Sequence, residues 1–388
     1  MIPVIRPVLG EEEAAAAAEA VRSGWVAQGP RVAEFEGAFA ARVGAGHGVA
    51  TSSCTTALHL ALLLAGVGPG DEVVVPSLSF IATANVVRHA GAEAVFADVD
   101  PATGNLTGKT VEVALTGRTR AVIAVDQAGV PVDLDGIRAV CDPRGITVVE
   151  DAACAAGSVY KGRPAGAGAD LAAWSFHPRK LLTTGEGGML TTPDAARARR
   201  ARRLREHGMS VSAAERHASA EVVIEEYAET GFNYRMTDLQ AAVGLVQLTR
   251  LDAIVSRRRA LAARYHRLLA GVPGLECVRD PAYGRANFQS FWILLPDDFP
   301  PDRDDLLRRM LAAGVSARRG IMAAHREPAY AGVPADLPVT DRFTTRSLIL
   351  PLFHDMTGEQ QDRVVETIAD AALAGGRGGP SSRKDTAV

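Results

Sequence analysis

Short apolar runs alternate with helical patterns along the first two thirds of the chain. The runs have the composition of buried strands and lie at residues 48–51, 72–76, 94–97, 121–125 and 146–149. Residues 11–22 are strong helix formers with acidic residues in the first turn, and 57–65 is a further expected helix. This alternation predicts an α/β domain with a mostly parallel sheet, whose working residues lie where strands end and helices begin.

The pattern changes in the last third of the chain. Residues 237–270 have a continuous helical pattern, and a strand at 288–295 is then mixed with helices. We therefore expect a large domain over residues 1–250, which includes the N-terminal helix, and a smaller α+β domain over 251–375. Residues 376–388 show no apolar periodicity and are expected to be disordered.

Composition narrows the class of protein. The chain has 388 residues, of which 47% are hydrophobic, and a formal net charge of -3. A chain of this length can bury the cores of both domains. The nearly balanced charge indicates neither a nucleic-acid nor a membrane-surface partner, and no apolar run is long enough to cross a bilayer. The N-terminus has no signal-peptide pattern, so we expect a cytoplasmic protein.

Metal and nucleotide sites are not indicated by the usual motifs. The four cysteines lie far apart without a C-x-x-C pair, so neither a zinc site nor a disulfide framework is expected. Residues 103–110 resemble a P-loop, but Thr103 stands where its first glycine is required, and a surface turn is the better interpretation. The dinucleotide-binding fingerprint fails as well, because Val49 and Leu171 occupy the positions of its last glycine.

Two candidate features follow the first predicted strands. Residues 53–56 open an apolar helix, where free N–H groups, hydroxyls and the helix dipole could bind a phosphate. A simple N-cap that binds nothing is the alternative. Phe80, just after the strand at 72–75, could stack on a planar ligand or belong to the core.

Two further features follow later strands. Asp151 is a carboxylate at the end of a buried strand, which is costly unless it faces a cation. A protonated pyridine nitrogen is one such cation, and an internal arginine or a helix cap is the alternative. Lys180 precedes the glycine-rich turn at 185–188, which would let the backbone lie close to a flat ligand. Burial would lower the pKa of this amine and suit it to a Schiff base, whereas a solvated surface lysine is the alternative.

The order of these features along the chain decides between the alternatives. A phosphate site, an aromatic ring, a buried aspartate, and then Ser175 and Lys180 lie on successive β/α units. One ligand would satisfy them all if it had a phosphate, an aromatic ring, a basic ring nitrogen and an aldehyde. Pyridoxal phosphate has these four groups.

Seven segments carry a resemblance to a known family. They are 29–30 with 35–36, 52–62, 68–85, 125–137, 150–153, 175–189 and 231–248. In this order they resemble the DegT/DnrJ/EryC1/StrS family of sugar aminotransferases, over residues 23 to about 351. The resemblance implies the fold-type I (aspartate aminotransferase-like) α/β architecture, with a large, mostly parallel-sheet domain and a smaller C-terminal α+β domain. It also implies pyridoxal 5'-phosphate as the cofactor.

The resemblance assigns roles to individual residues. It makes Lys180 the lysine that carries the cofactor as a Schiff base, and Asp151 the partner of the pyridine nitrogen. Phe80 would stack on the ring. The residues that it implies for the phosphate are Cys54, Thr55 and Ser175. Asn233 would reach the phosphate of a neighbouring subunit, so the family implies a homodimer with shared active sites.

One position departs from the family pattern. Where the family has glutamine or histidine near the cofactor's 3-hydroxyl, this chain has Cys154, and a thiol is a weaker hydrogen-bond partner. Lys180 is retained, which disfavours the family's dehydratases, in which histidine replaces it. Substrate residues are less well defined. His177, Arg319 and His325 could line the substrate entrance, or could belong to an ordered loop and a charged surface.

The resemblance implies transfer of an amino group from glutamate or glutamine to an acceptor. The acceptor would be a nucleotide-linked keto sugar or a keto-cyclitol. Such a reaction belongs to secondary-metabolite or cell-surface sugar biosynthesis. Two alternatives stay open: another reaction of pyridoxal phosphate on the same scaffold, such as elimination or dehydration, and a non-catalytic pathway scaffold. The intact Lys180, Asp151 and 185–188 turn argue against the scaffold, since binding alone would not need the lysine.

Overall fold

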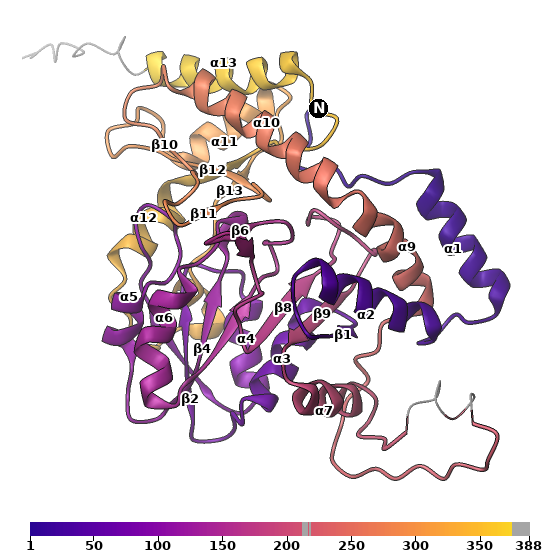
Figure 1. The fold of residues 1–388 in the computed structure, drawn as a ribbon. Helices are drawn as coiled ribbons and strands as arrows, with labels where there is room; N and C mark the ends of the chain where they lie inside the picture. The colour runs from indigo at the N-terminus through magenta and orange to yellow at the C-terminus, as the bar shows by residue number, and fades with distance from the viewer. Residues whose placement is uncertain (212–215, 217–218, 375–388) are drawn as a thin grey trace, which may run out of the picture.

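The computed structural model describes residues 1–211, 216 and 219–374 (Figure 1). The tail predicted to be disordered, 376–388, lies outside the described residues. Within the described ranges the strands form a seven-stranded, a four-stranded and a three-stranded sheet. No helix in these ranges is long and apolar enough to cross a membrane.

The large sheet has the strand order β1-β9-β8-β5-β4-β2-β3. Its strands from β3 to β8 pair in parallel, while β9 runs antiparallel to both β8 and β1. The strands are β1 (His47–Thr51), β2 (Glu72–Pro76), β3 (Glu93–Ala97), β4 (Thr119–Val125), β5 (Thr147–Asp151), β8 (Leu171–Ser175) and β9 (Gly188–Thr192). The predicted α/β class with a mostly parallel sheet is confirmed.

Helices cover both faces of this sheet, because successive residues of its central strands point to opposite faces. Along β4, Val122 and Ala124 belong to one hydrophobic core, and Ala121 and Ile123 belong to the other. The helices that contribute to the first core are α2 (Pro30–Arg42), α5 (Gly108–Ala114) and α6 (Leu134–Cys141). Those that contribute to the second are α3 (Cys54–Leu64), α4 (Ala82–His89) and α7 (Ala195–Arg205).

The second sheet is antiparallel and belongs to the C-terminal third, as expected for a smaller α+β unit. Its order is β10-β12-β14-β13. The strands are β10 (Glu276–Cys277), β12 (Phe291–Leu294), β13 (Arg318–Arg319) and β14 (Ser347–Leu350). The helices of this unit are α10 (Leu251–Leu269), α11 (Arg303–Ala312), α12 (Pro338–Arg346) and α13 (Gly358–Ala374). Figure 1 shows α10, α11 and α13 at the end of the molecule away from β2.

Shorter elements connect the two units. The third sheet contains β6 (Val159–Tyr160), β7 (Arg163–Pro164) and β11 (Gly284–Arg285). The described single-turn helices are Gln127–Gly129, Asp142–Arg144, Ala324–Arg326 and Pro328–Tyr330. Because β11 follows α10 in the chain yet pairs with β6, the C-terminal third is joined to the large unit by backbone hydrogen bonds.

The N-terminal segment contacts the small sheet before the chain enters the large one. Ile2 forms a parallel bridge with Val315, and the N–H of Leu352 donates to the Val4 carbonyl at 3.1 Å. Figure 1 accordingly shows the N-terminus beside α10 and α13. Next along the chain, α1 (Glu11–Ser23) packs against α9 (Asp238–Thr249). The division of the chain at residue 250 stays a prediction.

Two predicted elements need correction. The helix predicted over 237–270 is two helices, α9 and α10, which meet at Arg250. Their apolar patterns follow each other without a glycine or proline to mark the junction. The strand predicted over 288–295 is shortened to β12, because Phe288 has a φ of 52° and this left-handed backbone cannot continue a strand.

The segment that resembles a P-loop is a turn only as far as Thr107. The Thr107 hydroxyl accepts a hydrogen bond from the N–H of Thr110 at 3.1 Å and so caps α5. The predicted surface turn over 103–110 is therefore half right, because its last residues begin a helix.

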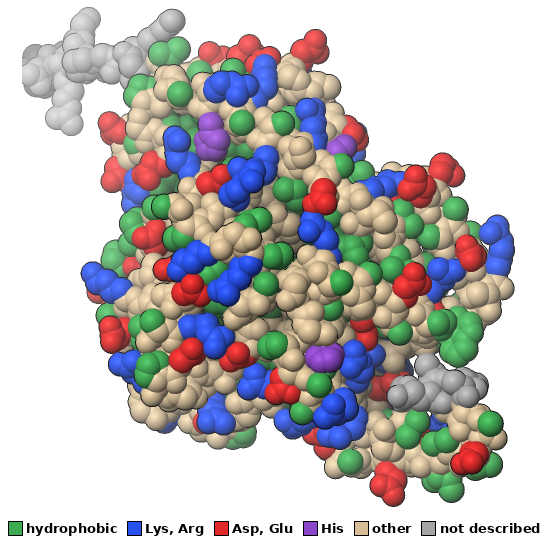
Figure 2. All heavy atoms as spheres, in the orientation of Figure 1, with side chains coloured by type: hydrophobic (Ala, Val, Ile, Leu, Met, Phe, Trp, Pro, Cys, Tyr) green, Lys and Arg blue, Asp and Glu red, His purple; other side chains and the backbone are tan. Residues whose placement is uncertain are grey.

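Charged side chains of both signs lie interspersed over the face shown in Figure 2. This mixture accords with the formal net charge of -3. Among the residues that the structure describes, no group of three or more His, Cys, Asp or Glu side chains is placed to hold a metal ion.

Candidate active site

The candidate site lies at the carboxyl edge of the large sheet. Asp151 ends β5, Ser175 ends β8, and the loop after β8 carries Lys180. Neighbouring parallel strands end at the same edge, so these residues converge. Lys180 Nζ lies 3.1 Å from Cys154 Sγ, and Cys54 Sγ lies 4.0 Å from Asp151 Oδ1. We call Cys54, Asp151, Cys154 and Lys180 the central cluster.

Asp151 is a buried carboxylate that accepts two hydrogen bonds. It is 5% exposed, and its oxygens accept from Thr83 Oγ1 at 3.0 Å and from the N–H of Ala153 at 3.2 Å. Burial raises the pKa of Asp151, and this effect exceeds the lowering by Lys180 and the two hydrogen bonds. Such a carboxylate gains from a nearby cation, for which a protonated ring nitrogen is well suited. Sequence reasoning missed Thr83, because no motif links it to a carboxylate so far along the chain.

The pKa of Lys180 moves against expectation. Burial lowers the pKa of Lys180, as expected from the sequence. Cys154, Cys54 and Asp151 together raise it by more than burial lowers it, so the net shift is upward. In the protein alone the amine is therefore a cation among acidic groups. Burial, reinforced by the charge of Asp151, also raises the pKa of Cys54 well above its usual range.

The start of α3 has the properties of an anion site. Ser53 Oγ caps the helix by accepting the N–H of Thr56 at 3.2 Å, so the N-cap interpretation holds for Ser53. The N–H groups of Cys54 and Thr55 have no acceptor within the helix, and the helix dipole places positive potential there. Ser175 is the last residue of β8 and lies opposite Gly188 of β9. Gly188 in turn lies against the start of α3. These groups are of the kind that a cofactor phosphate requires.

Gly188, the first residue of β9, lies so close to α3 that no side chain fits. A Cβ on Gly188 would overlap the backbone of Ser53 and Cys54. We expect Gly188→Ala to displace the helix start, to lower the free energy of unfolding by about 1–3 kcal/mol and to weaken binding of pyridoxal phosphate. Thermal unfolding and cofactor titration measure both effects. Gly117→Ala, which meets nothing within 4 Å, is the control, and a Gly188→Ala protein with unchanged stability and affinity would contradict this geometry.

Phe80 and Asn233 are both exposed in the single chain. Phe80 follows β2 and is 65% exposed, which contradicts the interpretation as a core residue and leaves its ring free to stack. Asn233 forms a backbone bridge with Glu206, and the carbonyl of the next residue, Tyr234, accepts the N–H of Ser52 at 2.8 Å. Asn233 is thus anchored near the start of α3. Stacking by Phe80 and a contact of Asn233 across subunits stay predictions.

The three predicted substrate residues make intramolecular contacts. His177 Nδ1 accepts the N–H of Arg179 at 3.1 Å, which orders the loop before Lys180. His325 Nδ1 lies 2.7 Å from Ser77 Oγ, and its Nε2 lies 3.2 Å from a carboxylate oxygen of Asp341 in α12. Arg319 is paired with a carboxylate of its own unit at 3.4 Å. These contacts favour the alternatives of an ordered loop and a charged surface, and direct roles with substrate stay predictions.

Two more carboxyl groups are buried at the ends of the strands near the central cluster, Glu150 next to Asp151 in β5 and Asp126 directly after β4. Asp126 is fully buried and Glu150 is 2% exposed. One oxygen of each accepts a backbone N–H, from Val132 and from Gly166 respectively, both at 2.8 Å. Burial raises the pKa of both groups, and Glu150 raises that of Asp126 further. Each group is therefore protonated more readily in the folded protein than in the unfolded chain.

The raised pKa values of Asp126 and Glu150 make stability depend on pH. Above an unfolded pKa of about 4 a carboxyl group is ionised in the unfolded chain, and one that is still protonated in the folded protein costs up to about 1.4 kcal/mol of stability per pH unit until its own raised pKa is reached. Asp126→Asn keeps the shape and cannot ionise. We expect its stability to fall less than that of the wild type from about pH 5 to about pH 8, measured by urea unfolding. Exposed Asp336→Asn is the control, and parallel profiles for Asp126→Asn and wild type would contradict the raised pKa of Asp126.

Comparison with known proteins places the chain in a family. The model of the DegT/DnrJ/EryC1/StrS aminotransferase family matches residues 7–369. The chain belongs to this family. Membership confirms the predicted resemblance and the fold-type I architecture, and makes the chain a pyridoxal-phosphate-dependent aminotransferase.

Several solved structures of the family are similar over nearly the whole chain. The aminotransferase TlmJ from Streptoalloteichus hindustanus is 38% identical with a TM-score of 0.89, covering 96% of this chain and 99% of that one. The putative sugar aminotransferase Spr1654 from Streptococcus pneumoniae, solved in PMP- and PLP-forms, is 27% identical with TM-scores of 0.91 and 0.89, covering 96% of this chain and 100% and 99% of those. The sugar aminotransferase CalS13 from Micromonospora echinospora is 31% identical with a TM-score of 0.86, covering 95% and 100%.

Proposed function

We propose that this family member transfers the amino group of glutamate or glutamine to a keto sugar, nucleotide-linked, or to a keto-cyclitol. The observation that carries the proposal is the central cluster at the carboxyl edge of the sheet, where Lys180 Nζ lies 3.1 Å from Cys154 Sγ and Asp151 is buried, in a chain whose relatives include proteins named sugar aminotransferases. We place this reaction in secondary-metabolite or cell-surface sugar biosynthesis in the cytoplasm.

Lys180 is the proposed covalent anchor of the cofactor. The chain has four lysines, of which Lys384 lies outside the described residues. Lys109 is exposed, and Lys161 is exposed and bound to Asp135 at 2.9 Å. Lys180 Nζ instead lies among the acidic groups of the central cluster. No other described lysine has surroundings that suit a buried carbonyl ligand.

The remaining candidates fit the chemical groups of pyridoxal phosphate. We assign Asp151 to the protonated ring nitrogen and Phe80 to the ring face. The phosphate falls to the start of α3, through Cys54 and Thr55, and to Ser175. When bound, the cofactor supplies an electron sink for charge that develops on the donor's α-carbon.

The chain's own residues then hold and move the protons. Asp151 keeps the proton on the ring nitrogen, since its buried carboxylate is stabilised by that cation. Lys180, once free, takes the proton from the donor's α-carbon as a general base and returns it as a general acid. Thr83 orients Asp151 through its hydrogen bond at 3.0 Å.

A homodimer with shared sites is part of the proposal. Asn233 is exposed, and its side chain has no hydrogen bond or ion pair with another described residue. The apolar side chains of Trp25, Val26 and Phe80 are 39%, 46% and 65% exposed, so they are available to a second subunit. We assign Asn233 to the phosphate site of the partner subunit.

Cys154 supports a second candidate function. Its Sγ lies 3.1 Å from Lys180 Nζ, where the family usually has glutamine or histidine. A thiol is a weaker hydrogen-bond partner for the cofactor's 3-hydroxyl, and this difference is the feature that favours elimination or dehydration as the second candidate reaction. A non-catalytic scaffold is disfavoured, because a protein that only binds the cofactor would not need a lysine in the central cluster.

The test is a half-reaction of purified protein loaded with pyridoxal phosphate. Glutamate or glutamine should abolish the visible absorbance of the bound cofactor and release one keto acid per site. A panel of keto-sugar nucleotides and keto-cyclitols should then restore it, each acceptor being recovered as an amine. An acceptor that loses water without gaining the donor's nitrogen would favour dehydration, and no spectral change with any amino acid would favour the scaffold.

A further inference from the structure

Residues 287–290, just before β12, contact the loop that carries Cys154. Asn287 is fully buried, and its Nδ2 donates to the carbonyls of Cys154 and Ala156 at 2.7 and 2.9 Å. Its Oδ1 accepts the N–H of Gln289 at 2.7 Å. Because both the donor and the acceptor group of this amide are in use, its orientation is fixed. Asn287 therefore joins Gln289 to one loop of the central cluster.

Gln289 binds the other loop of the central cluster, which carries Lys180. It is 8% exposed, and its Nε2 donates to the Arg179 carbonyl at 2.7 Å. Its Oε1 accepts from Ser290 Oγ at 2.8 Å. Arg179 directly precedes Lys180, so the Cα atoms of the two residues are about 3.8 Å apart. One short segment thus connects both loops of the cluster by hydrogen bonds to their backbone.

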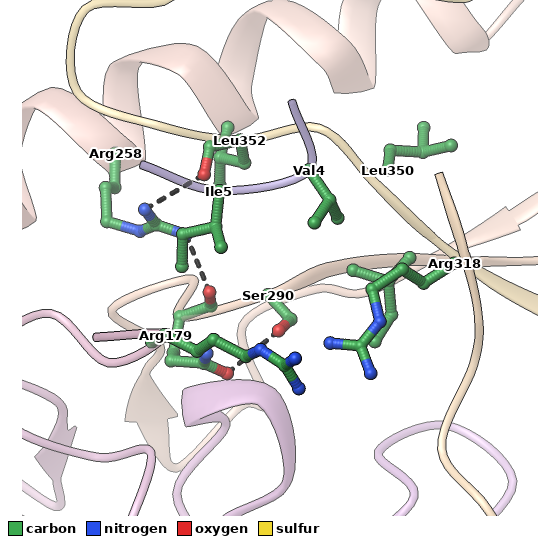
Figure 3. A pocket seen from close by; sticks show the side chains of 10 residues that line it. Val4, Ile5, Arg179, Arg258, Ser290, Arg318, Leu350 and Leu352 are labelled. Carbon is green, nitrogen blue, oxygen red and sulfur yellow. Dashed lines mark hydrogen bonds between the residues drawn. The ribbon is translucent and has the colours of Figure 1, made fainter. Parts of the chain in front are cut away.

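A strained backbone residue and a buried cation fix this segment. Phe288 has a φ of 52°, in the left-handed region that is unfavourable for a bulky residue. Arg258 of α10 is 4% exposed and donates to the carbonyls of Phe288 and Gln289 at 2.8 and 2.6 Å. Figure 3 shows Arg258, Arg179 and Ser290 around one small pocket, which Gln289 also lines. Such a backbone persists only where its surroundings hold it, and strain of this kind gathers at sites that need a fixed geometry.

The centre of the cluster depends on how its two loops are spaced. Lys180 Nζ lies 3.1 Å from Cys154 Sγ, and the hydrogen bonds from Asn287 and Gln289 end at the backbone of these two loops. The loops follow strands of the large sheet, whereas residues 287–290 lead into the small sheet. The two amides therefore tie the position of the reacting amine to the small unit.

We propose that Gln289 is a positioning residue for amino transfer, which acts through the Arg179 carbonyl to fix the place of Lys180 Nζ. This inference rests on the proposed function. Lys180 must come within reach of the donor's α-carbon to move its proton, and a misplacement of about 1 Å can cost about 10²-fold in rate. Because Gln289 acts through the backbone, it should change how fast bound donor reacts more than how tightly the donor binds.

Two substitutions remove the hydrogen bond to the Lys180 loop. Gln289→Glu keeps the acceptor for Ser290 and loses the amide donor, and Gln289→Met has a similar length without charge or an N–H donor. In a single-turnover half-reaction, both should lower the limiting rate about 10- to 100-fold, with a much smaller change in half-saturation by glutamate or glutamine. Uptake of pyridoxal phosphate by the cofactor-free protein should slow as well, because the same amine attacks the cofactor's aldehyde.

The matched control is Gln361→Met. Gln361 is fully buried, and its Nε2 also donates to a backbone carbonyl, that of Leu261 at 3.0 Å, but it joins α13 to α10 within the small unit. This variant should lower the melting temperature and leave the rates unchanged. The proposal is wrong if both Gln289 variants keep the wild-type limiting rate, if only half-saturation rises, or if Gln361→Met loses as much rate as they do.

The pH dependence of the visible absorbance separates positioning from a loss of stability. The pH at which the absorbance of the loaded protein changes reports on the surroundings of the lysine nitrogen. It should shift in both Gln289 variants and stay unchanged in Gln361→Met, and no shift in any of them would overturn the proposal. A wild type that takes up the cofactor on Lys180 and reacts with no amino acid would overturn the proposed function, whereas slower uptake and a shifted absorbance in the Gln289 variants would still support the positioning role.

Discussion

Replacing Lys180 with alanine should give a protein that folds and binds pyridoxal phosphate only weakly, without the visible absorbance of a lysine-linked cofactor. Amino transfer should fall by about 10⁴-fold or more, because loss of the general base alone costs about 10²- to 10⁴-fold and the covalent anchor is lost as well. Absorbance after cofactor loading and a single-turnover half-reaction measure the two effects.

The matched control is Lys161→Ala, which removes an exposed lysine that binds Asp135 on the surface. We expect its absorbance and its rate to equal those of the wild type. A Lys180→Ala protein that keeps its absorbance and reacts within about tenfold of the wild-type rate would show that another amine carries the cofactor.

Asp151→Asn should separate activity from stability. The amide keeps the shape of the carboxylate and its contact with Thr83 but lacks the charge that holds a proton on the ring nitrogen. We expect the half-reaction to slow by about 10²- to 10³-fold. The melting temperature of the cofactor-free protein should change little, because relief of the desolvation of Asp151 is offset by loss of its attraction to the Lys180 cation.

Rapid mixing with glutamate and thermal unfolding measure the two quantities. Exposed Asp355→Asn serves as the control for loss of one carboxylate at the surface. Equal half-reaction rates for Asp151→Asn and wild type would show that Asp151 does not hold the proton on the ring nitrogen. A rate loss accompanied by a large drop in melting temperature would instead point to a structural role.

The fold could be predicted from the sequence wherever local pattern and burial agree. The apolar run at 121–125 is buried from both sides in β4, and this is the situation in which such a run predicts a parallel strand. The junction of α9 and α10 at Arg250 could not be predicted, because no local signal marks it. The exposure of Phe80 could not be predicted either, because an aromatic residue that follows a strand can be buried in the core or can stack on a ligand.

The central cluster was predictable in its members but not in its electrostatics. Lys180 and Asp151 follow strands, and the sheet topology then brings them to one edge. The upward shift of the Lys180 pKa depends on Cys54 and Cys154, whose closeness to the amine is a property of the folded chain. Thr83 was missed for the same reason. These contacts join residues that only the tertiary structure makes neighbours.

The most direct test of the central claim is to fix the cofactor in place and find it. Borohydride treatment of the loaded protein, followed by digestion and mass spectrometry, should locate a reduced cofactor on the peptide that contains Lys180. Prior incubation with glutamate or glutamine should remove this adduct, because the donor displaces the lysine. An adduct on Lys109 or Lys161, no adduct at all, or an adduct that no amino acid removes would contradict the assignment of Lys180 as the anchor of amino transfer.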